Sequence, residues 1–591
     1  MDDFIFGTLA TEQLKRERVE AIRSGISHNF NRRPLDPAPA DPITVHLSLG
    51  PSHHSDRAWV YWTVDGSDPV GRDGVTEQGS ALPMHLSNTE WDTVLWGYIR
   101  HFEAILPGLP AKTLVRYKFG VRTLEQGEVY AEEGKIFAFY VDDDPLPAWT
   151  RDAIVYEIFV DRFFPGTGKT WLNPAGPSGF FGGTLRGITE KMDYLADLGV
   201  NVLWLTPIFP SPSHHGYDAT DLFDIEPRLG SKKDLDDLLR VAHAAGTRVL
   251  LDLVPNHVSN QHPIFQSAAQ DAKSAYRNWF NFKRWPDEYE TFFGVRSLPQ
   301  INLRNAEARK HVLDAAAYWL DFGVDGYRVD YAIGPAADFW AEFRMVTRAA
   351  KPDCWTFGEI VDPPDVQVSF EGQLDGALDF MLLEAIRQSI AFGRWNSARL
   401  ASFLERHARF FGDGFSLPSF LDNHDMNRFL WAAGNDKRKL MLAALLQFTL
   451  AGPPVIYYGT EVGLSQNKDV RQGTRGFPEE SRLPMVWGNQ QDSDLFRYYQ
   501  ELIELRKGCA VMRRGRLESI RVEDGCLLLT RNYEGEKMTA VVNSGPQPGE
   551  VGVPAGMARV FSTPNAEVPS PLPGEGAFTL PSLAGAIFKD P

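Results

Sequence analysis

The chain has 591 residues and a formal net charge of −17, which predicts several domains and argues against a nucleic-acid partner or an anionic membrane surface. Its three cysteines are too few and too scattered for a disulfide framework or a zinc site. No stretch approaches the about 18 apolar residues of a membrane span, and the N-terminal segment lacks the pattern of a secretory signal, so we expect no membrane association and a cytoplasmic location.

The first part of the chain, residues 1–146, is predicted to be a β-domain. Residues 8–24 favour a short leading helix, and alternating segments rich in β-branched and aromatic residues follow between 43 and 142. This spacing of short strands predicts an N-terminal β-sandwich. The strand pattern returns near the end of the chain, so residues 506–591 are predicted to form a C-terminal β-sandwich domain.

The region between them, residues 147–505, alternates between strands and helices. Its eight candidate strands are 153–159, 200–208, 248–254, 324–330, 354–360, 374–380, 419–425 and 453–461. Apolar strands separated by helices are typical of a parallel sheet covered on both faces, and eight such units predict a (β/α)8 TIM barrel in an α/β protein. The connection after the third strand is too long for one helix, so we expect residues 258–300 to form a small inserted domain over the barrel mouth.

Three acidic residues lie at predicted carboxyl-terminal strand ends, namely Asp330, Glu359 and Asp425. The carboxyl ends of all barrel strands meet at one face, where TIM-barrel enzymes keep their chemistry. Taken alone, Arg328 and Asp330 could be a structural ion pair that caps a strand. Three carboxylates in one cleft are poor packing, however, because like charges repel and burial is costly. They suit retaining glycoside hydrolysis, which needs one carboxylate nucleophile and one protonated carboxyl group.

The neighbouring residues suggest which acid has which role. Arg328 beside Asp330 is expected to keep the nucleophile ionised, because a nearby cation lowers the pKa of a carboxyl group. Glu359 lies in the aromatic and apolar segment CWTFGEI, which favours a raised pKa and therefore a general acid.

Four short segments resemble the signature regions of the α-amylase family, glycoside hydrolase family 13. They are DLVPNH (252–257), DGYRVD (325–330), FGEI (357–360) and FLDNHD (420–425), in the order of the family and on the expected strands. LPQIN (298–302) resembles a further region of the same family. The β-domain before the barrel is similar to the N-terminal module of the neopullulanase, cyclomaltodextrinase and maltogenic amylase group.

The resemblance implies roles for the residues that match these regions. Asp330 would be the nucleophile, oriented by Arg328, and Glu359 would be the acid/base. Asp425 would be a third acid that grips sugar hydroxyl groups and stabilises the transition state.

The same resemblance implies a set of substrate-binding residues. His257 and His424 would hydrogen-bond the sugar at the cleavage subsite, and Tyr217 would stack beneath that sugar. Arg482 resembles, less closely, an arginine that contacts substrate in relatives. For Asp218 a binding role and a structural role stay open.

The resemblance to this group also implies an oligosaccharide substrate and a homodimer formed through the N-terminal domain. Small or cyclic maltooligosaccharides would be cleaved at α-1,4 bonds, and cleavage of α-1,6 bonds stays open. Two alternatives remain at this point. The first is a transferase of the same family that passes maltosyl or glucosyl units to another sugar or closes rings. The second is a non-catalytic carbohydrate-binding protein.

Three segments depart from patterns of the family. YAIG (331–334) stands where an endo-acting α-amylase has Lys-His. GEIVDPP (358–364) departs from the pattern of the group, so we expect the acceptor side of the substrate cleft to differ. The loop after the first strand lacks the Asp/Asn cluster that binds calcium in many relatives, and calcium prefers such oxygen ligands. We therefore expect no metal in the active site and no required cofactor. A structural calcium ion stays open, although its usual motif is not seen.

Overall fold

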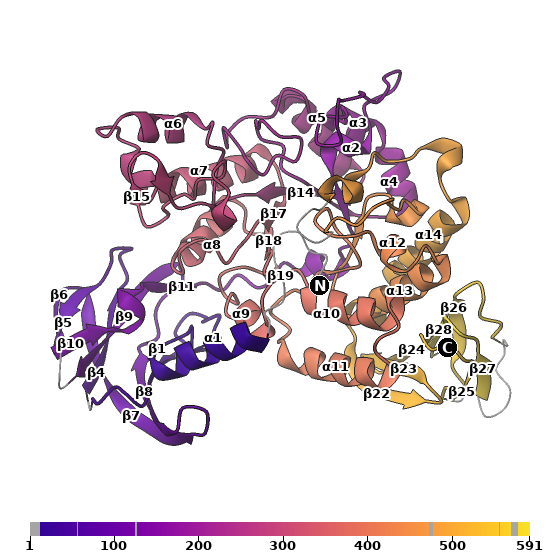
Figure 1. The fold of residues 1–591 in the computed structure, drawn as a ribbon. Helices are drawn as coiled ribbons and strands as arrows, with labels where there is room; N and C mark the ends of the chain where they lie inside the picture. Colours follow the sequence, from indigo (N-terminus) through magenta and orange to yellow (C-terminus); the bar gives the residue numbers. More distant parts are fainter. Residues whose placement is uncertain are drawn as a thin grey trace.

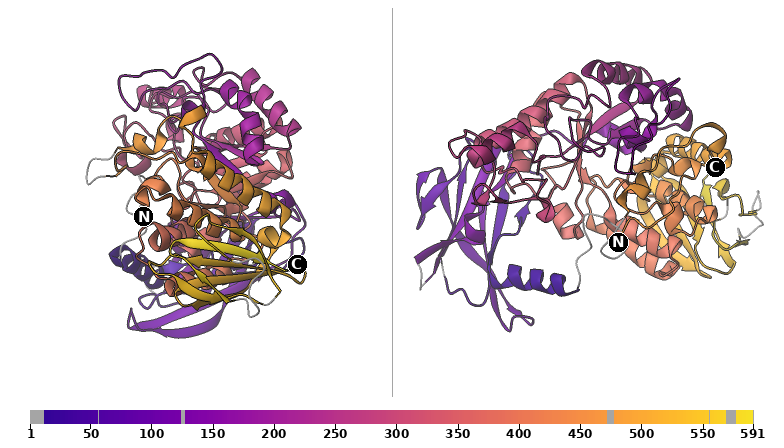
Figure 2. Two further views of the ribbon diagram at one scale, coloured as in Figure 1. Left: turned by 90° about the vertical axis from the view of Figure 1, so that its right-hand side faces the viewer. Right: turned by 45° about the horizontal axis from the view of Figure 1, so that its top comes forward.

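The computed structural model describes residues 12–55, 57–123, 127–471, 477–554, 556–568 and 577–590. An N-terminal β-domain and a C-terminal β-domain lie on opposite sides of a central barrel (Figures 1 and 2). The described part of the leading helix is α1 (Glu12–Ser24), and the first residues of the predicted helix, 8–11, lie outside the described ranges. Within those ranges no helix is long and apolar enough to cross a membrane.

The N-terminal domain is an antiparallel sheet of nine strands folded into two layers. Its strands are β1 (Ile26–Ser27), β2 (Arg32–Arg33), β3 (Ile43–Leu49), β4 (Arg57–Thr63), β7 (Ser80–Asp92), β8 (Gly97–Leu106), β9 (Thr113–Thr123), β10 (Gly127–Tyr130) and β11 (Phe137–Val141), and β5 (Val70–Arg72) pairs separately with β6 (Val75–Gln78). The first half of β7 pairs with β4 and its second half with β8, so this one strand joins the two layers. Alternate apolar side chains, such as Val45 on β3 and Phe119 on β9, fill the space between the layers.

Eight parallel strands form the central barrel. In order around it they are β12 (Val155–Ile158), β13 (Val202–Leu205), β14 (Arg248–Leu253), β17 (Gly326–Val329), β18 (Trp355–Gly358), β19 (Gly376–Ala377), β20 (Ser419–Phe420) and β21 (Pro454–Tyr457). The first strand pairs with both the second and the last, and the gap between β19 and β20 is closed by backbone bonds such as Ala377 N to Ser416 O (3.0 Å). Each strand lies inside one of the eight predicted runs, which confirms the predicted barrel.

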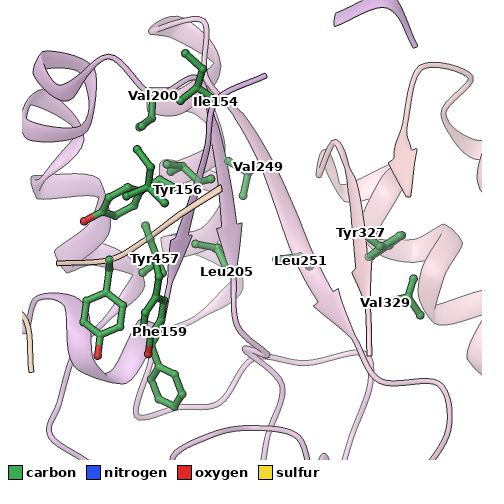
Figure 3. Close-up of a cluster of buried hydrophobic side chains, with 14 of the residues drawn as sticks. Ile154, Tyr156, Phe159, Val200, Leu205, Val249, Leu251, Tyr327, Val329 and Tyr457 are labelled. Carbon is green, nitrogen blue, oxygen red and sulfur yellow. The ribbon is translucent and has the colours of Figure 1, made fainter. Parts of the chain in front are cut away.

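Helices follow the strands and cover the outside of the barrel. They are α2 (Val160–Phe163), α3 (Leu185–Glu190), α4 (Met192–Leu198), α5 (Lys232–Ala244), α7 (Ala306–Phe322), α8 (Phe339–Ala350), α9 (Pro364–Val368), α10 (Phe380–Ile386), α11 (Ser397–Phe410), α12 (Phe429–Ala432), α13 (Lys437–Thr449), α14 (Ser493–Gly508) and α15 (Ala510–Arg514). A reciprocal capping box between Ser231 and Asp234 begins α5, and Gly323, with φ of 124°, ends α7. Figure 3 shows part of the apolar layer between strands and helices, including Tyr156, Leu251 and Val329.

Between β14 and α7 the chain leaves the barrel. This excursion contains α6 (Pro263–Gln270) and the hairpin of β15 (Phe282–Arg284) and β16 (Glu288–Tyr289). Backbone bridges from His257 to Gln300 and from Phe280 to Ile301 bring the chain back. The inserted domain after the third strand is therefore present as predicted.

The C-terminal domain packs against the barrel with a five-stranded antiparallel sheet. Its order is β22 (Arg516–Glu523), β23 (Cys526–Tyr533), β24 (Glu536–Asn543), β28 (Ala584–Lys589) and β26 (Ala558–Ser562), and β25 (Gly549–Gly552) pairs with β27 (Ala577–Leu580). The buried guanidinium groups of Arg506 and Arg531 donate to carbonyl groups at the end of α13, including Phe448 O (2.5 Å) and Thr449 O (2.7 Å). These two cations therefore supply hydrogen bonds to carbonyl groups at the C-terminus of α13, at the boundary between the barrel and the C-terminal domain.

Candidate active site

The alternation of side chains along the strands places polar groups inside the barrel. On β17, Tyr327 and Val329 pack toward the helices, so Arg328 between them points inward. The same two-residue period puts these further side chains in the interior: Glu157 on β12, Trp204 on β13, Asp252 on β14 and Phe357 on β18. Asp330 and Glu359 follow one inward step later, at the carboxyl ends of β17 and β18.

Arg328 is the centre of the site and is completely buried. Its Nη1 donates to both oxygens of Asp252 (2.7 and 2.9 Å) and to Oδ1 of Asp330 (2.9 Å). Its Nη2 lies 2.6 Å from Oε1 of Glu359, an ion pair whose alignment is not that of a hydrogen bond. One guanidinium therefore touches three carboxyl groups and holds Asp330 and Glu359 close to each other.

His424 forms a second centre between β12 and the third acid. Its Nδ1 lies 2.6 Å from Oε1 of Glu157, and its Nε2 lies 2.7 Å from the Tyr217 hydroxyl and 3.2 Å from Oδ2 of Asp425. Burial lowers the pKa of His424, but Asp425 and Glu157 outweigh burial and raise it to about 10. These two acids therefore favour the charged form of the imidazole.

Asp425 is held in the ionised form. Burial raises its pKa, but the His424 and Arg482 cations together move the pKa of Asp425 below its usual range. Nη2 of Arg482 donates to Oδ1 of Asp425 (2.7 Å), and its Nε donates to the carbonyl oxygen of His424 (2.9 Å). Arg482 therefore fixes both the charge and the position of the third acid.

Glu359 has the pKa expected of a general acid. Burial raises the pKa of Glu359 to about 8, opposed by Arg328 and reinforced by the negative charges of Asp330 and Asp425. Burial also raises the pKa of Asp330, although Arg328 acts against it. Arg328 lowers the pKa of Asp330, as predicted, but burial and the negative charge of Asp252 raise it, and the net shift is upward.

Three further residues named from the sequence lie on loops around these centres. The ring of Tyr217 lies parallel to His424 at 5.2 Å, and its hydroxyl donates to Oδ2 of Asp252 (2.9 Å). His257 is buried and stacks on Phe292 at 4.5 Å, and its Nε2 has no hydrogen-bond partner among the described residues. Asp218 accepts hydrogen bonds from loop serines, including Ser211 Oγ (2.6 Å), so its contacts brace the loop after β13.

Comparison with known proteins identifies the family. A model described as the catalytic domain of alpha-amylase matches residues 157–515. The chain belongs to the α-amylase family. A protein named alpha-amylase 2 of Dictyoglomus thermophilum is 36% identical over 518 residues, which cover 87% of each chain. A cyclomaltodextrinase of Geobacillus thermopakistaniensis is 32% identical over 518 residues, 81% of this chain and 83% of the relative. The solved type III pullulan hydrolase from Thermococcus kodakarensis matches with a TM-score of 0.68 and 26% identity, and covers 94% of this chain and 98% of its own.

Two parts of the site in this α-amylase family member were missed from the sequence. Glu157 is an acid inside the apolar strand AIVYEIF. The two-residue alternation along a strand, which also directs Asp252 and Arg328 into the barrel, is the signal that could have found it. Phe292 of the inserted domain contacts Tyr331 (4.9 Å), the residue after the predicted nucleophile, and no local signal announces that contact. Tyr331 itself has a left-handed backbone, with φ of 42°.

No group of three or more His, Cys, Asp or Glu side chains within the described ranges is arranged to hold a metal ion.

Proposed function

We propose that this member of the α-amylase family is a retaining α-glucoside hydrolase that cleaves small or cyclic maltooligosaccharides. The observation that carries the proposal is the contact of one buried guanidinium, Arg328, with both Asp330 (2.9 Å) and Glu359 (2.6 Å). Carboxyl groups about 5–5.5 Å apart are characteristic of retaining glycosidases, whereas inverting enzymes keep them further apart to admit a water. The similarity to a cyclomaltodextrinase supports the substrate class.

In the first step, Glu359 gives its proton to the glycosidic oxygen while Asp330 attacks the anomeric carbon. With a pKa of about 8, Glu359 carries this proton at neutral pH. Arg328 forms an aligned hydrogen bond with Asp330 but not with Glu359, which favours the ionised form at Asp330. Because Arg328 holds Oδ1 of Asp330, Oδ2 is the attacking oxygen.

In the second step, Glu359 takes a proton from water as the water attacks the glycosyl–Asp330 ester. Asp425, kept ionised by Arg482 and His424, binds sugar hydroxyl groups and stabilises the positive charge that develops on the ring. The unpartnered Nε2 of His257 is a further hydrogen-bonding atom for the sugar.

The decisive experiment is a product panel with β-cyclodextrin, maltotriose, pullulan and starch. We expect glucose and maltose as the main products, with cyclodextrin and maltotriose cleaved faster than starch. ¹H NMR of the earliest products should show the α-anomer, as retention requires. Larger or cyclic products in excess over glucose and maltose would make the protein a transferase, and a β-anomer would contradict the double displacement.

We also propose that the protein is a homodimer joined through its N-terminal domain. The support is a cluster of apolar side chains at the β7–β8 hairpin, where Trp96 is 80% and Tyr98 is 64% exposed beside Trp91. Such a patch favours a protein interface. We expect light scattering to give a dimer mass and Trp96→Ser to give a monomer. Trp285→Ser, at an exposed tryptophan of the inserted domain, is the matched control and should stay dimeric.

We propose further that catalysis needs no cofactor or metal ion, because carboxyl groups alone supply the nucleophile and the proton. Dialysis against EDTA should leave kcat/KM unchanged, and a loss that Ca²⁺ restores would contradict this. A cytoplasmic location is supported by the three cysteines, all buried and free, as a reducing compartment keeps them. Cell fractionation with an antibody to the protein tests the location.

A further inference from the structure

Glu157 is a buried carboxyl group for which the steps above have no use. Its side chain is fully shielded from solvent inside the barrel. Oε1 meets Nδ1 of His424 at 2.6 Å, and Oε2 has no hydrogen-bond partner among the described residues. A carboxylate buried with so few partners destabilises a fold unless a cation neutralises it. Burial raises the pKa of Glu157, and His424 and Arg328 act against burial. Of these two groups, His424 is the one that contacts the carboxyl group among the described residues.

The hydrogen bonds around His424 have one consistent direction. The Tyr217 hydroxyl is placed to donate to Asp252 (2.9 Å), and with its hydrogen there the same oxygen accepts from Nε2 of His424 (2.7 Å). Nε2 also faces Oδ2 of Asp425 (3.2 Å), which favours a hydrogen on this nitrogen. On the other side of the ring, Nδ1 faces Glu157. Both ring nitrogens therefore face acceptors, which is the environment of an imidazolium rather than of a neutral histidine.

We propose that Glu157 is a positioning residue that holds His424 as a doubly protonated cation, with Nε2–H directed at Tyr217 and Asp425. Through His424 it fixes the ring of Tyr217 and the charge of the third acid during the hydrolysis proposed above, on which the catalytic part of this inference rests. The raised pKa of His424, about 10, agrees with this geometry.

The remaining charges near His424 do not replace Glu157. The titratable and charged groups that face it or act on it are Glu157 on β12, Tyr217 after β13, Asp252 on β14, Arg328 on β17, Glu359 after β18, Asp425 beside it and Arg482 on the last loop. Asp425 is already paired with Arg482, and Asp252 with Arg328. Glu157 is the acid in this group whose carboxyl group has His424 as its one hydrogen-bond partner among the described residues.

The direct test is the protonation of His424 in the substrate-free wild-type protein. In ¹⁵N-histidine-labelled protein, the signal absent from His424→Gln identifies this ring. We expect both nitrogens to carry hydrogen from pH 6 to about 9, as the pKa of about 10 requires. A ring with one bare nitrogen at neutral pH would mean that the proton sits on Glu157, and would overturn the proposal. This measurement needs no variant of Glu157 to fold.

The variant Glu157→Gln then tests the cause. Glutamine keeps the size of the side chain and an acceptor oxygen but removes the charge, so His424 should lose its second proton at least about one pH unit lower. Glu157→Asp restores the charge and should return the His424 titration toward that of the wild type. An unchanged His424 titration in Glu157→Gln would refute the role.

Glu461→Gln is the matched control. Glu461 is also fully buried with one unpartnered oxygen, but it accepts from Tyr156 (2.7 Å) and Tyr194 (2.5 Å) on the outer side of the barrel. This variant should lower the thermal stability and leave the His424 titration unchanged. The His424 titration is independent of substrate, so a failure of this inference differs from a failure of the proposed function, in which the wild type would not hydrolyse maltooligosaccharides.

Discussion

Two aspartates of the segment DGYRVD stand at opposite ends of the same barrel strand and have opposite environments. Asp325, at the amino end, meets His243 Nε2 (2.7 Å), Lys351 Nζ (2.8 Å) and Arg248 Nη1 (3.3 Å). Burial raises its pKa, but Lys351, a backbone amide and His243 outweigh burial, and the pKa of Asp325 is lowered. At this end, three basic side chains contact one carboxylate and compensate its negative charge.

The negative charge of Asp330, at the carboxyl end of the strand, is compensated by fewer cations. It shares the single guanidinium of Arg328 with Asp252 and Glu359, and burial raises its pKa. The same residue type on one strand is therefore compensated by several donors at one end and by one shared guanidinium at the other. In a TIM barrel the amino-terminal face serves stability and the carboxyl-terminal face serves catalysis. Here the two ends of β17 differ in the number of cations that contact each carboxylate.

The largest expected effect separates the two aspartates by activity. Asp330→Asn should lower kcat on maltotriose by at least about 10⁴-fold, the scale of losing a nucleophile. Asp325→Asn should keep kcat near the wild-type value, because Asp325 lies at the far end of the strand from the substrate. Steady-state kinetics of both variants measures the difference. Comparable losses in the two would mean that the ends of β17 are not functionally distinct.

In the free energy of unfolding, we expect the opposite order, with the larger effect for Asp325→Asn. Asp325→Asn should lower the free energy of unfolding by about 2–3 kcal/mol, since it leaves buried donors and cations without their carboxylate. Asp330→Asn should leave the free energy of unfolding unchanged or raise it, because it relieves repulsion among carboxylates. Urea denaturation followed by tryptophan fluorescence measures both. A stability loss for Asp330→Asn as large as that for Asp325→Asn would remove the contrast.

The pH dependence of activity is expected to depend on the carboxyl end of the strand alone, where Asp330 and Glu359 lie. Glu359 must be protonated to act as the acid, so kcat/KM should fall as the pH rises through about 8. Asp325→Asn, in which only the distant amino end is altered, should show the same alkaline limb. A limb that moves in Asp325→Asn would show that the two ends are electrostatically coupled.

A further expected effect is a pH dependence of stability with opposite sign at the two ends. The folded pKa of Glu359 is raised to about 8, so its stabilising contribution is full below about 4.3 and is lost as the pH rises through about 8. Glu359→Gln should therefore gain stability relative to the wild type as the pH rises. The folded pKa of Asp325 is lowered, so its contribution is present above about 3.9 and lost at lower pH.

For Asp325→Asn, the stability deficit relative to the wild type should accordingly shrink as the pH falls below about 4. Denaturation midpoints at pH 3, 4, 7 and 9 test both variants. Equal pH dependence for Glu359→Gln and Asp325→Asn would contradict the assigned pKa directions.

The sequence by itself determined the barrel and the convergence of its acids. Eight apolar runs separated by helices leave few arrangements other than a parallel barrel, and the carboxyl ends of such strands must share one face. The positions of Asp330 and Glu359 at strand ends therefore placed them together before any coordinate was known. The long gap after the third strand likewise predicted the inserted domain.

Only the tertiary structure decided how those charges are compensated. Glu157 meets His424 across 267 positions of the chain, and Arg482 meets Asp425 from a separate loop. The pKa of Asp330 depends on burial and on charges such as those of Arg328 and Asp252, and the local segment DGYRVD shows neither the burial nor Asp252. Electrostatic interactions depend on distance in space and on burial, whereas the patterns that predict strands depend on neighbours in sequence. The fold was therefore readable from the chain, and the balance of charge within its active site was not.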